Sequence, residues 1–355
     1  MGYRICMTGL AMLASATMAV AQVAAPDPKI VSAAEAEGVV SVYSALDAAL
    51  AQDLIGDFSK LYPKVKVDYV DQSTTELYSR AISEAAAGNG SADVLLSSAM
   101  DLQYKLATDG LVQQYEVPDA AALEPWAVSK GVAYGVTQEP LVIVYNKRLF
   151  PEGDLPKTRD DLVKLLNEKT SEYDGKVATI DPERIATGFL FFTQDASHTD
   201  KTWDLVRALG KVNVKLYTST GAMLEKVTSG EHLIAYNIIG SYAVERAKKD
   251  PNIGVIFPSD YLISVSRIVL IPKTAPHSNS ARLFVDYLLS ERAQKILIGR
   301  SFGSVRTSLA GGSAVPEELQ SKVVPVKVDD GLLTYLDQST RMKFIRSWQQ
   351  ALRGK

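Results

Sequence analysis

The feature that most constrains the fold is a strand and helix pattern that repeats three times between residues 39 and 110. Three short apolar or alternating runs rich in β-branched residues, which are typical of strands, occur at 39–44, 65–69 and 92–96. Each is followed by a segment in which apolar residues recur with helical spacing, at 48–62, 76–87 and 101–108. Such alternation predicts a parallel sheet with helices on its faces, which is an α/β fold.

A second set of strands and helices follows the stretch Gly131–Asn146. Its run Leu141–Tyr145 (LVIVY) is almost continuously apolar, as expected of a strand buried on both faces. We interpret this stretch as the point where the chain leaves one lobe and enters another. The strand and helix pattern then recurs to about residue 250, and extended runs up to residue 272 would return the chain to the first lobe. The predicted division is 39–136 with 258–310 for lobe 1, and 137–257 with 311–355 for lobe 2.

The amino terminus has the pattern of a secretory signal peptide. Arg4 is its only charge before Asp27, an apolar run follows at 7–20, and Ala19-Val20-Ala21 fits a cleavage site of small residues. We therefore predict a signal peptide at 1–21, a linker at 22–38 and a periplasmic location. The single cysteine, Cys6, lies in the segment to be removed, so the mature chain would have no disulfide and no thiolate chemistry.

Composition excludes some classes of partner. The chain of 355 residues has 38 Lys and Arg against 41 Asp and Glu, so it offers no strongly basic surface for nucleic acid. Its 46% apolar and 22% charged content is that of an ordinary globular protein of two domains.

Hydroxyl and amide side chains recur where the predicted strands end and helices begin. In open α/β sheets, ligands bind at the carboxyl ends of the strands, and helix amino termini attract anions. Any one of these residues is also an ordinary helix cap. Their recurrence predicts an anion site. The candidates are Ser44, Thr74, Thr75 and Ser98 in lobe 1, Gln138 and Glu139 at the crossover, and Thr187, Ser219, Thr220, Tyr236 and Asn237 in lobe 2. Arg184 could pair with the anion or be solvated, and Tyr145 could equally belong to the core.

Five stretches of the chain resemble the periplasmic solute-binding proteins of ABC importers, and more closely the iron(III)-binding or AfuA-like branch. They are VYSALD at 42–47, YPKVKVDYVDQSTTELYSR at 62–80, SADVLLSSAMDLQ at 91–103, LVIVYNKRLF at 141–150 and SGEHLIAYNIIGSYA at 229–243. The resemblance implies a type II two-lobed fold, two or three hinge strands and a ligand held in the cleft between the lobes. It also implies a monomer that delivers its ligand to a membrane permease and an ATPase encoded as other chains.

The same branch contains ferric-ion binders and binders of phosphorylated organic molecules. The iron binders have an adjacent tyrosine pair in the second lobe, whereas Tyr236 and Tyr242 here are six positions apart. The three histidines, His198, His232 and His277, are scattered and show no metal-ligand spacing. We therefore expect no metal or other cofactor, and we expect the ligand to be a sugar phosphate or phosphonate held by hydrogen bonds.

Two other functions stay open at this point. One is ferric iron transport through a different ligand set. The other is a secreted enzyme that acts on a phosphorylated small molecule. The chain contains no G-x-S-x-G motif and no glycine-rich phosphate loop ending in lysine, so no motif places a catalytic group.

Overall fold

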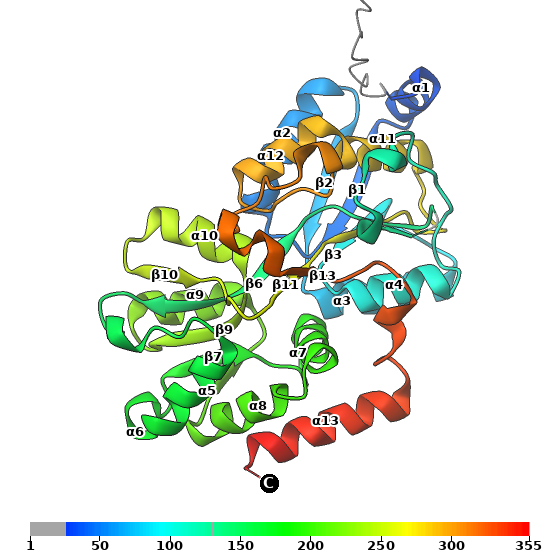
Figure 1. Ribbon diagram of the computed structural model, residues 1–355. Coiled ribbons are helices and arrows are strands. Elements are labelled where there is room, and N and C mark those ends of the chain that lie inside the picture. Colours follow the sequence, from blue (N-terminus) through cyan, green and yellow to red (C-terminus); the bar gives the residue numbers. More distant parts are fainter. Residues whose placement is uncertain (1–25, 130, 355) are drawn as a thin grey trace, which may run out of the picture.

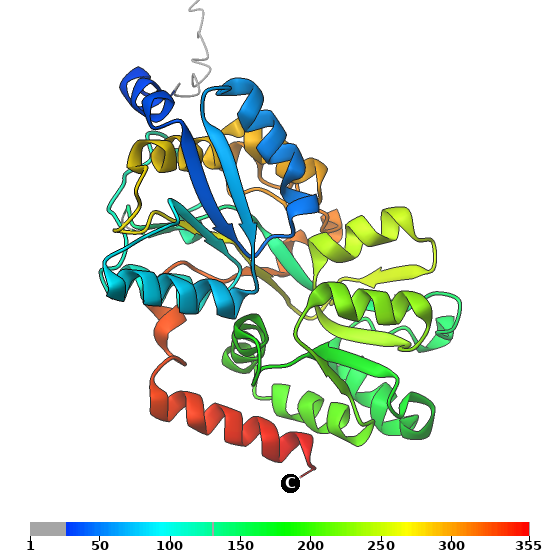
Figure 2. The same ribbon diagram turned by 180° about the vertical axis from the view of Figure 1, so that it is seen from behind.

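A computed structural model describes residues 26–129 and 131–354 and shows two α/β lobes connected by crossing strands (Figures 1 and 2). The two-lobed α/β fold predicted from the sequence is confirmed. The predicted signal peptide, 1–21, lies outside the described residues. Within the described part, no helix combines the length and the apolar character that a membrane crossing requires.

Lobe 1 is built on a six-stranded sheet in the order β2-β1-β3-β12-β5-β4. The three strands predicted from the 39–110 pattern, β1, β2 and β3, pair in parallel, and β12 joins them antiparallel. The strands are β1 (Val39–Ser44), β2 (Lys66–Asp71), β3 (Val94–Ser97), β4 (Val128–Ser129), β5 (Ala133–Gly135) and β12 (Ile268–Leu270). The helices are α1 (Pro28–Glu37), α2 (Ala48–Leu61), α3 (Thr74–Ala87), α4 (Met100–Thr108), α11 (Ser278–Leu289) and α12 (Glu291–Gly299).

Lobe 2 is built on a seven-stranded sheet in the order β13-β11-β6-β9-β7-β8, with β10 paired to β6. Strand β6 is the LVIVY run, and it is buried along most of its length as expected. The strands are β6 (Glu139–Asn146), β7 (Val177–Ile180), β8 (Lys215–Tyr217), β9 (Ile234–Ile239), β10 (Ile253–Ile256), β11 (Leu262–Val265) and β13 (Val323–Pro325). The helices are α5 (Arg159–Glu168), α6 (Thr170–Tyr173), α7 (Ala186–His198), α8 (Thr202–Lys211), α9 (Thr220–Ser229), α10 (Gly240–Lys249) and α13 (Gln338–Leu352).

The chain returns to lobe 1 later than the predicted boundary at residue 258. Strand β11 pairs with β6 and β13, so it belongs to the sheet of lobe 2. Strand β12, only three positions further on, pairs with β3 and β5 in lobe 1. The crossing therefore lies at Ser266-Arg267. An apolar run can join either sheet, and its pairing partner is not encoded in its own sequence.

Two further segments differ from the predicted division. The range 22–38, expected as a linker, contains helix α1, which packs along α11. The tail after residue 310 is not confined to lobe 2, because the turn Asp330–Leu333 packs on α4 of lobe 1. Helix α13 then lies beside α8 at the foot of lobe 2 (Figure 1). Phe344 and Trp348 of α13 pack on Phe189 and Phe192 of α7, so this helix belongs to lobe 2.

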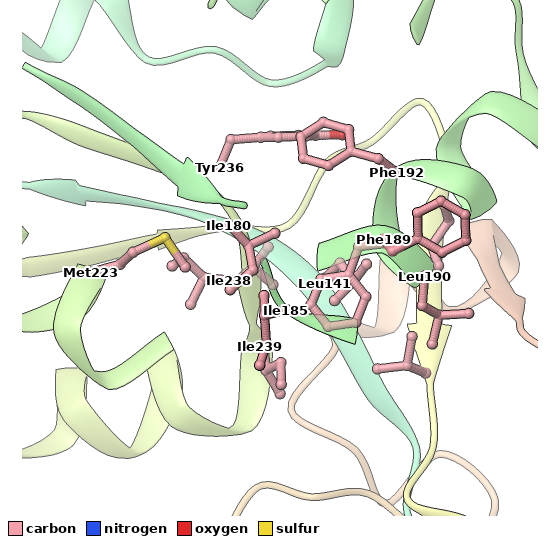
Figure 3. Packing of buried hydrophobic residues seen from close by; sticks show 14 of the residues in the cluster. Leu141, Ile180, Ile185, Phe189, Leu190, Phe192, Met223, Tyr236, Ile238 and Ile239 are labelled. Carbon is pink, nitrogen blue, oxygen red and sulfur yellow. The ribbon is translucent and has the colours of Figure 1, made fainter. Parts of the chain in front are cut away.

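The core of lobe 2 fixes the helix that borders the cleft. Helix α7 packs its aromatic residues against the sheet, and Figure 3 shows Phe189 and Leu190 beside Leu141 of β6 and Ile185. Fully burying side chains of this size contributes about 1.5–3 kcal/mol each relative to exposure. The amino terminus of α7 is thereby held in place beside β7 and β9.

Candidate ligand-binding cleft

A cavity of about 220 Å³ lies between the two lobes at the carboxyl ends of their parallel strands. Lobe 1 contributes polar side chains from the turns after β1, β2 and β3, which are Asp47, Asp71, Gln72, Ser73, Thr74 and Ser98. Lobe 2 contributes Thr187, Thr218, Ser219, Thr220 and Tyr242, and the crossing strand contributes Arg267. The cavity thus occupies the position at which open α/β sheets bind ligands.

A second hollow of similar size, about 210 Å³, is of a different kind. It lies on lobe 1 alone, between the end of α2, the loop at Val117 and helix α11. Because no residue of lobe 2 lines it, a molecule bound there would not bridge the two lobes. The interlobe cavity is therefore the better candidate for the functional site.

Six helices begin at or near the wall of the interlobe cavity. They are α2, α3 and α4 of lobe 1, and α7, α9 and α10 of lobe 2. The first turn of each helix carries backbone N–H groups without a helical partner and the positive end of the helix dipole. Ser73 caps α3 through a capping box with Glu76, and Ser219 caps α9 by accepting from the N–H of Ala222 at 3.1 Å. Such an arrangement favours a negatively charged group in the cavity.

Five of the eleven predicted site residues line this cavity. They are Thr74, Ser98, Thr187, Ser219 and Thr220. The hydroxyl of Thr74 is buried and has no hydrogen-bond partner among the described residues. A buried polar atom without a partner carries a cost of about 1–3 kcal/mol, which a bound ligand could relieve.

Ser44 and Thr75 lie next to the cavity but are not part of its wall. Ser44 is fully buried, and its hydroxyl accepts from the N–H of Leu46 at 3.1 Å, which fixes the turn that leads to α2. Thr75 is exposed, and its hydroxyl accepts from the N–H of Ala186 at 3.4 Å. That contact connects the start of α3 in lobe 1 to the start of α7 in lobe 2.

Tyr236 and Asn237 point away from the cavity, contrary to the prediction. The Tyr236 hydroxyl donates to Asp195 at 2.6 Å and accepts from Nε of Arg159 at 2.8 Å, inside lobe 2. Figure 3 shows Tyr236 extending toward Phe192, away from Ile239 at the cavity edge. Asn237 has a left-handed backbone, with φ of 59°, and its amide also approaches Asp195, at 3.4 Å. This break in strand geometry sends two successive side chains toward the same carboxylate.

Gln138 and Glu139 lie at the crossover, where the sequence placed them, but neither lines the cavity. The Gln138 N–H donates to the carbonyl of Phe302 at 2.9 Å. Glu139 is fully buried, forms an ion pair with Arg267 at 3.0 Å, and accepts from the hydroxyls of Thr137 and Ser241. Glu139 therefore fixes the crossing strands instead of contacting a ligand directly.

Arg184 and Tyr145, for which the sequence left two interpretations open, also lie outside the cavity. Arg184 is exposed and does not line it. Tyr145 is half-buried and packs against Phe150 with ring centroids 5.6 Å apart, so it belongs to the edge of the core.

Sequence reasoning missed four charged or phenolic residues of the wall: Asp47, Asp71, Tyr242 and Arg267. Arg267 had a usable signal, because a lone cation in the apolar run LISVSRIVL must find a partner when buried. Tyr242 was considered only as a metal ligand. Burial raises the pKa of Tyr242 to about 12, against the opposing effect of Arg267, so its hydroxyl stays protonated and can donate.

The cavity holds few of the groups that bind metals. Within the described ranges, no group of three or more His, Cys, Asp or Glu side chains is placed to hold a metal ion. Tyr242 reaches the cavity and Tyr236 does not. The histidines are engaged elsewhere: His198 packs on Tyr261, His232 contacts the Tyr217 hydroxyl at 2.6 Å, and His277 pairs with Asp93 at 3.0 Å.

Two α/β lobes, strands that cross between them and a polar cavity in the cleft define a two-lobed binding protein. Comparison with family models agrees, because residues 38–295 match the model described as bacterial extracellular solute-binding protein. The chain belongs to this family.

Similar proteins include one that is named for iron uptake and one whose structure contains a sugar phosphate. A crystal structure of the substrate binding protein of an ABC transporter from Agrobacterium tumefaciens is 37% identical, with a TM-score of 0.83, covering 90% of this chain and 97% of that one. Iron uptake protein A1 of Synechocystis sp. is 25% identical over 303 residues, 78% of each chain. AfuA from Actinobacillus pleuropneumoniae, solved with fructose-6-phosphate bound, shares the fold, with 20% identity and a TM-score of 0.72 over 89% of this chain and 99% of that one.

Proposed function

We propose that the protein is the substrate-binding component of an ABC importer and that its cleft captures a small phosphorylated organic molecule. The observation that carries this proposal is the convergence of six helix amino termini on one interlobe cavity. Helix dipoles and N–H groups bind phosphate without requiring several Lys or Arg side chains. The Agrobacterium relative is described as part of an ABC transporter, and the AfuA structure contains a sugar phosphate.

The proposal includes export to the periplasm, followed by delivery of the ligand to a membrane permease driven by an ATPase. The predicted signal peptide and the family support export. Mass spectrometry of the protein recovered from the periplasm tests it, since cleavage after Ala21 would leave Gln22 as the first residue.

Lobe closure over the ligand would couple capture to delivery. Two contacts already span the lobes at the cavity edge, from the N–H of Ala186 to Thr75 and from the N–H of Asp47 to the Tyr242 hydroxyl, each at 3.4 Å. Both are at the long limit of hydrogen bonding, so each contributes little alone. A ligand that fills the cavity would supply the remaining contacts between the lobes.

A thermal unfolding screen of purified protein tests the proposed ligand class. The panel contains sugar phosphates, alkylphosphonates, inorganic phosphate, polyols, carboxylates and ferric citrate. A ligand present at 100 times its Kd stabilises the folded state by about 2.7 kcal/mol. A response to ferric ion with none to phosphorylated compounds would replace this proposal by iron transport, for which Iron uptake protein A1 is the relevant relative.

The same compounds test the enzymatic alternative. Release of inorganic phosphate from a bound phosphate ester by the pure protein would indicate an enzyme. Stable binding with unchanged ligand recovered after denaturation supports the transport function.

A further inference from the structure

The two walls of the interlobe cavity differ in charge. On the wall from lobe 1, Asp47 and Asp71 present two carboxylates. The described lining residues of lobe 2 are hydroxyl, apolar or glycine residues and include no carboxylate. Arg267 is the one basic residue of the lining, and it is already paired with the buried Glu139. A simple anion would therefore meet helix amino termini on both walls, but on the wall from lobe 1 it would also meet two negative side chains.

Asp47 does not cap helix α2, although its position suggests that it should. It is the residue before α2, where an aspartate usually accepts a hydrogen bond from the first turn of the helix. Here it makes no such bond. Asp71, from the end of β2, accepts from the N–H of Ala48 at 3.1 Å instead. Asp71 thus acts as the hydrogen-bond acceptor for the first turn of α2. The Asp47 side chain does not take part in this cap and lines the cavity.

The two carboxylates repel each other. Lost hydration and the charge of Asp71 raise the pKa of Asp47, while Arg267 and a hydrogen bond from Tyr242 oppose this. A positive group of the ligand between the two carboxylates would relieve that repulsion.

An independent observation places ligand contacts on the same segment. Thr74 is 6% exposed, lines the cavity, and its hydroxyl has no partner among the described residues. The amide nitrogen of Gln72 is likewise buried without a partner in the described part of the chain. Gln72 follows Asp71 directly, and Thr74 is the first residue of α3, three positions after Asp71. This turn therefore combines a carboxylate with two neutral groups whose hydrogen bonds are unmade.

We propose that the ligand carries a protonated amine as well as a phosphate or phosphonate, with the amine held between Asp47 and Asp71 and the oxyanion held at the helix starts of lobe 2. This inference rests on the proposed function and narrows its ligand class to zwitterions. Thr187, Ser219 and Thr220 would surround the oxyanion. The Thr74 hydroxyl would accept from the amine, and the Gln72 amide nitrogen would donate to an oxygen of the ligand. A neutral sugar phosphate would leave the carboxylate pair without a cation.

Calorimetry with matched ligand pairs tests the inference. Each pair differs by the amine: 2-aminoethylphosphonate against ethylphosphonate, phosphoethanolamine against ethyl phosphate, and glucosamine 6-phosphate against glucose 6-phosphate. Titrations contain EDTA, so that a metal ion cannot substitute for the amine. We expect the amine to improve affinity at least tenfold in one or more pairs.

Asp47→Asn and Asp71→Asn should each reduce this preference at least tenfold, because each removes one of the two negative charges that the amine would contact. Because Asp71 also caps α2, Asp47→Asn is the cleaner variant, and circular dichroism checks that both are folded. Asp68→Asn is the matched control, since Asp68 lies on the same strand, has a side chain that is 47% exposed and pairs with Lys66. It should retain the preference.

The outcomes separate the two proposals. Binding of phosphorylated compounds with no preference for the amine, or a preference that survives in Asp47→Asn and Asp71→Asn, overturns the zwitterion inference alone. Tighter binding of amine-free compounds only when Mg²⁺ or Ca²⁺ replaces EDTA also overturns it, in favour of a metal-bridged anion. Failure of every phosphorylated compound to bind overturns the proposed function and this inference with it.

Discussion

Glu139 and Arg267 form a buried ion pair that joins the two strands crossing between the lobes. Their side chains are 0% and 1% exposed, and Nε of Arg267 lies 3.0 Å from Oε1 of Glu139. Arg267 also donates to the carbonyl of Ala45 at 2.8 Å. The guanidinium of Arg267, which lines the ligand cavity, thus connects the first strand of lobe 2 to the turn after β1 in lobe 1.

Removing one partner of this pair should strongly destabilise the protein. Arg267→Ala leaves Glu139 as an uncompensated buried charge, which costs about 3–5 kcal/mol. The measurement is the shift of the urea unfolding curve. Arg292→Ala is the control, because Arg292 pairs with Asp57 at the surface and its loss should destabilise the protein far less. The double variant Glu139→Gln, Arg267→Met should be less destabilised than Arg267→Ala, and an equal or greater loss would contradict this account.

The strand and helix order of both lobes could be predicted because it depends on local patterns. Apolar runs, helical spacing and caps such as Ser73 with Glu76 are encoded within a few residues of where they act. The same reasoning located the cleft, since the carboxyl ends of parallel strands share one edge of a sheet. Thr74, Ser98 and Thr187 reached the cavity for that reason.

The remaining site residues depended on information that is not local. Strand β11 could have paired in either lobe, so the position of Arg267 at the crossing was hidden. Strand alternation failed at Asn237, whose left-handed backbone turns Tyr236 and Asn237 into the interior of lobe 2. Asp47 and Asp71 resembled ordinary helix caps, and only the three-dimensional contacts show that Asp71 has taken the cap and Asp47 has not.

Variants at Thr74 and Ser73 should have different effects, the first on ligand binding and the second on the stability of α3. The Thr74 hydroxyl is buried and makes no hydrogen bond to the described residues, so Thr74→Val should stabilise the ligand-free protein by up to about 1–3 kcal/mol while weakening ligand binding severalfold. Ser73 caps α3, so Ser73→Ala should cost about 1 kcal/mol of stability. Thermal unfolding and calorimetry measure both quantities. A Thr74→Val protein that binds as the wild type would remove Thr74 from the site.

Stability should depend on pH through Asp101 at the start of α4. Burial raises the pKa of Asp101 to about 7, although the N–H of Leu102 and the charge of Arg341 oppose this. From about pH 4 to pH 7 the folded state then holds more protons than the unfolded state, so stability falls as pH rises through this window. Above pH 7, the free energy of unfolding that is lost through Asp101 is at most roughly 4 kcal/mol.

The variant Asp101→Asn tests this pH dependence, because it keeps the shape and removes the ionisation. Its stability relative to wild type should increase between pH 5 and pH 8. The comparison cancels the contributions of other titrating groups to the pH dependence. One such group is Asp286, because burial raises its pKa to about 6. A difference between variant and wild type that is constant across this range would show that Asp101 does not titrate there.

Gly188 controls how closely the start of α7 approaches β7, and hence one wall of the cavity. A Cβ at this position would lie 2.4 Å from the carbonyl oxygen of Asp181, which is backbone and cannot move aside easily. Gly188→Ala should therefore displace the first turn of α7, cost about 1–3 kcal/mol of stability and weaken ligand binding, because Thr187 lines the cavity. Gly56→Ala in α2 is the matched control: nothing lies within 4 Å of its Cβ, so better helix propensity should stabilise it by about 0.5–1 kcal/mol with unchanged affinity. Urea unfolding and calorimetry on both variants measure these effects, and equal ligand affinity in the two would show that the cavity tolerates movement of α7.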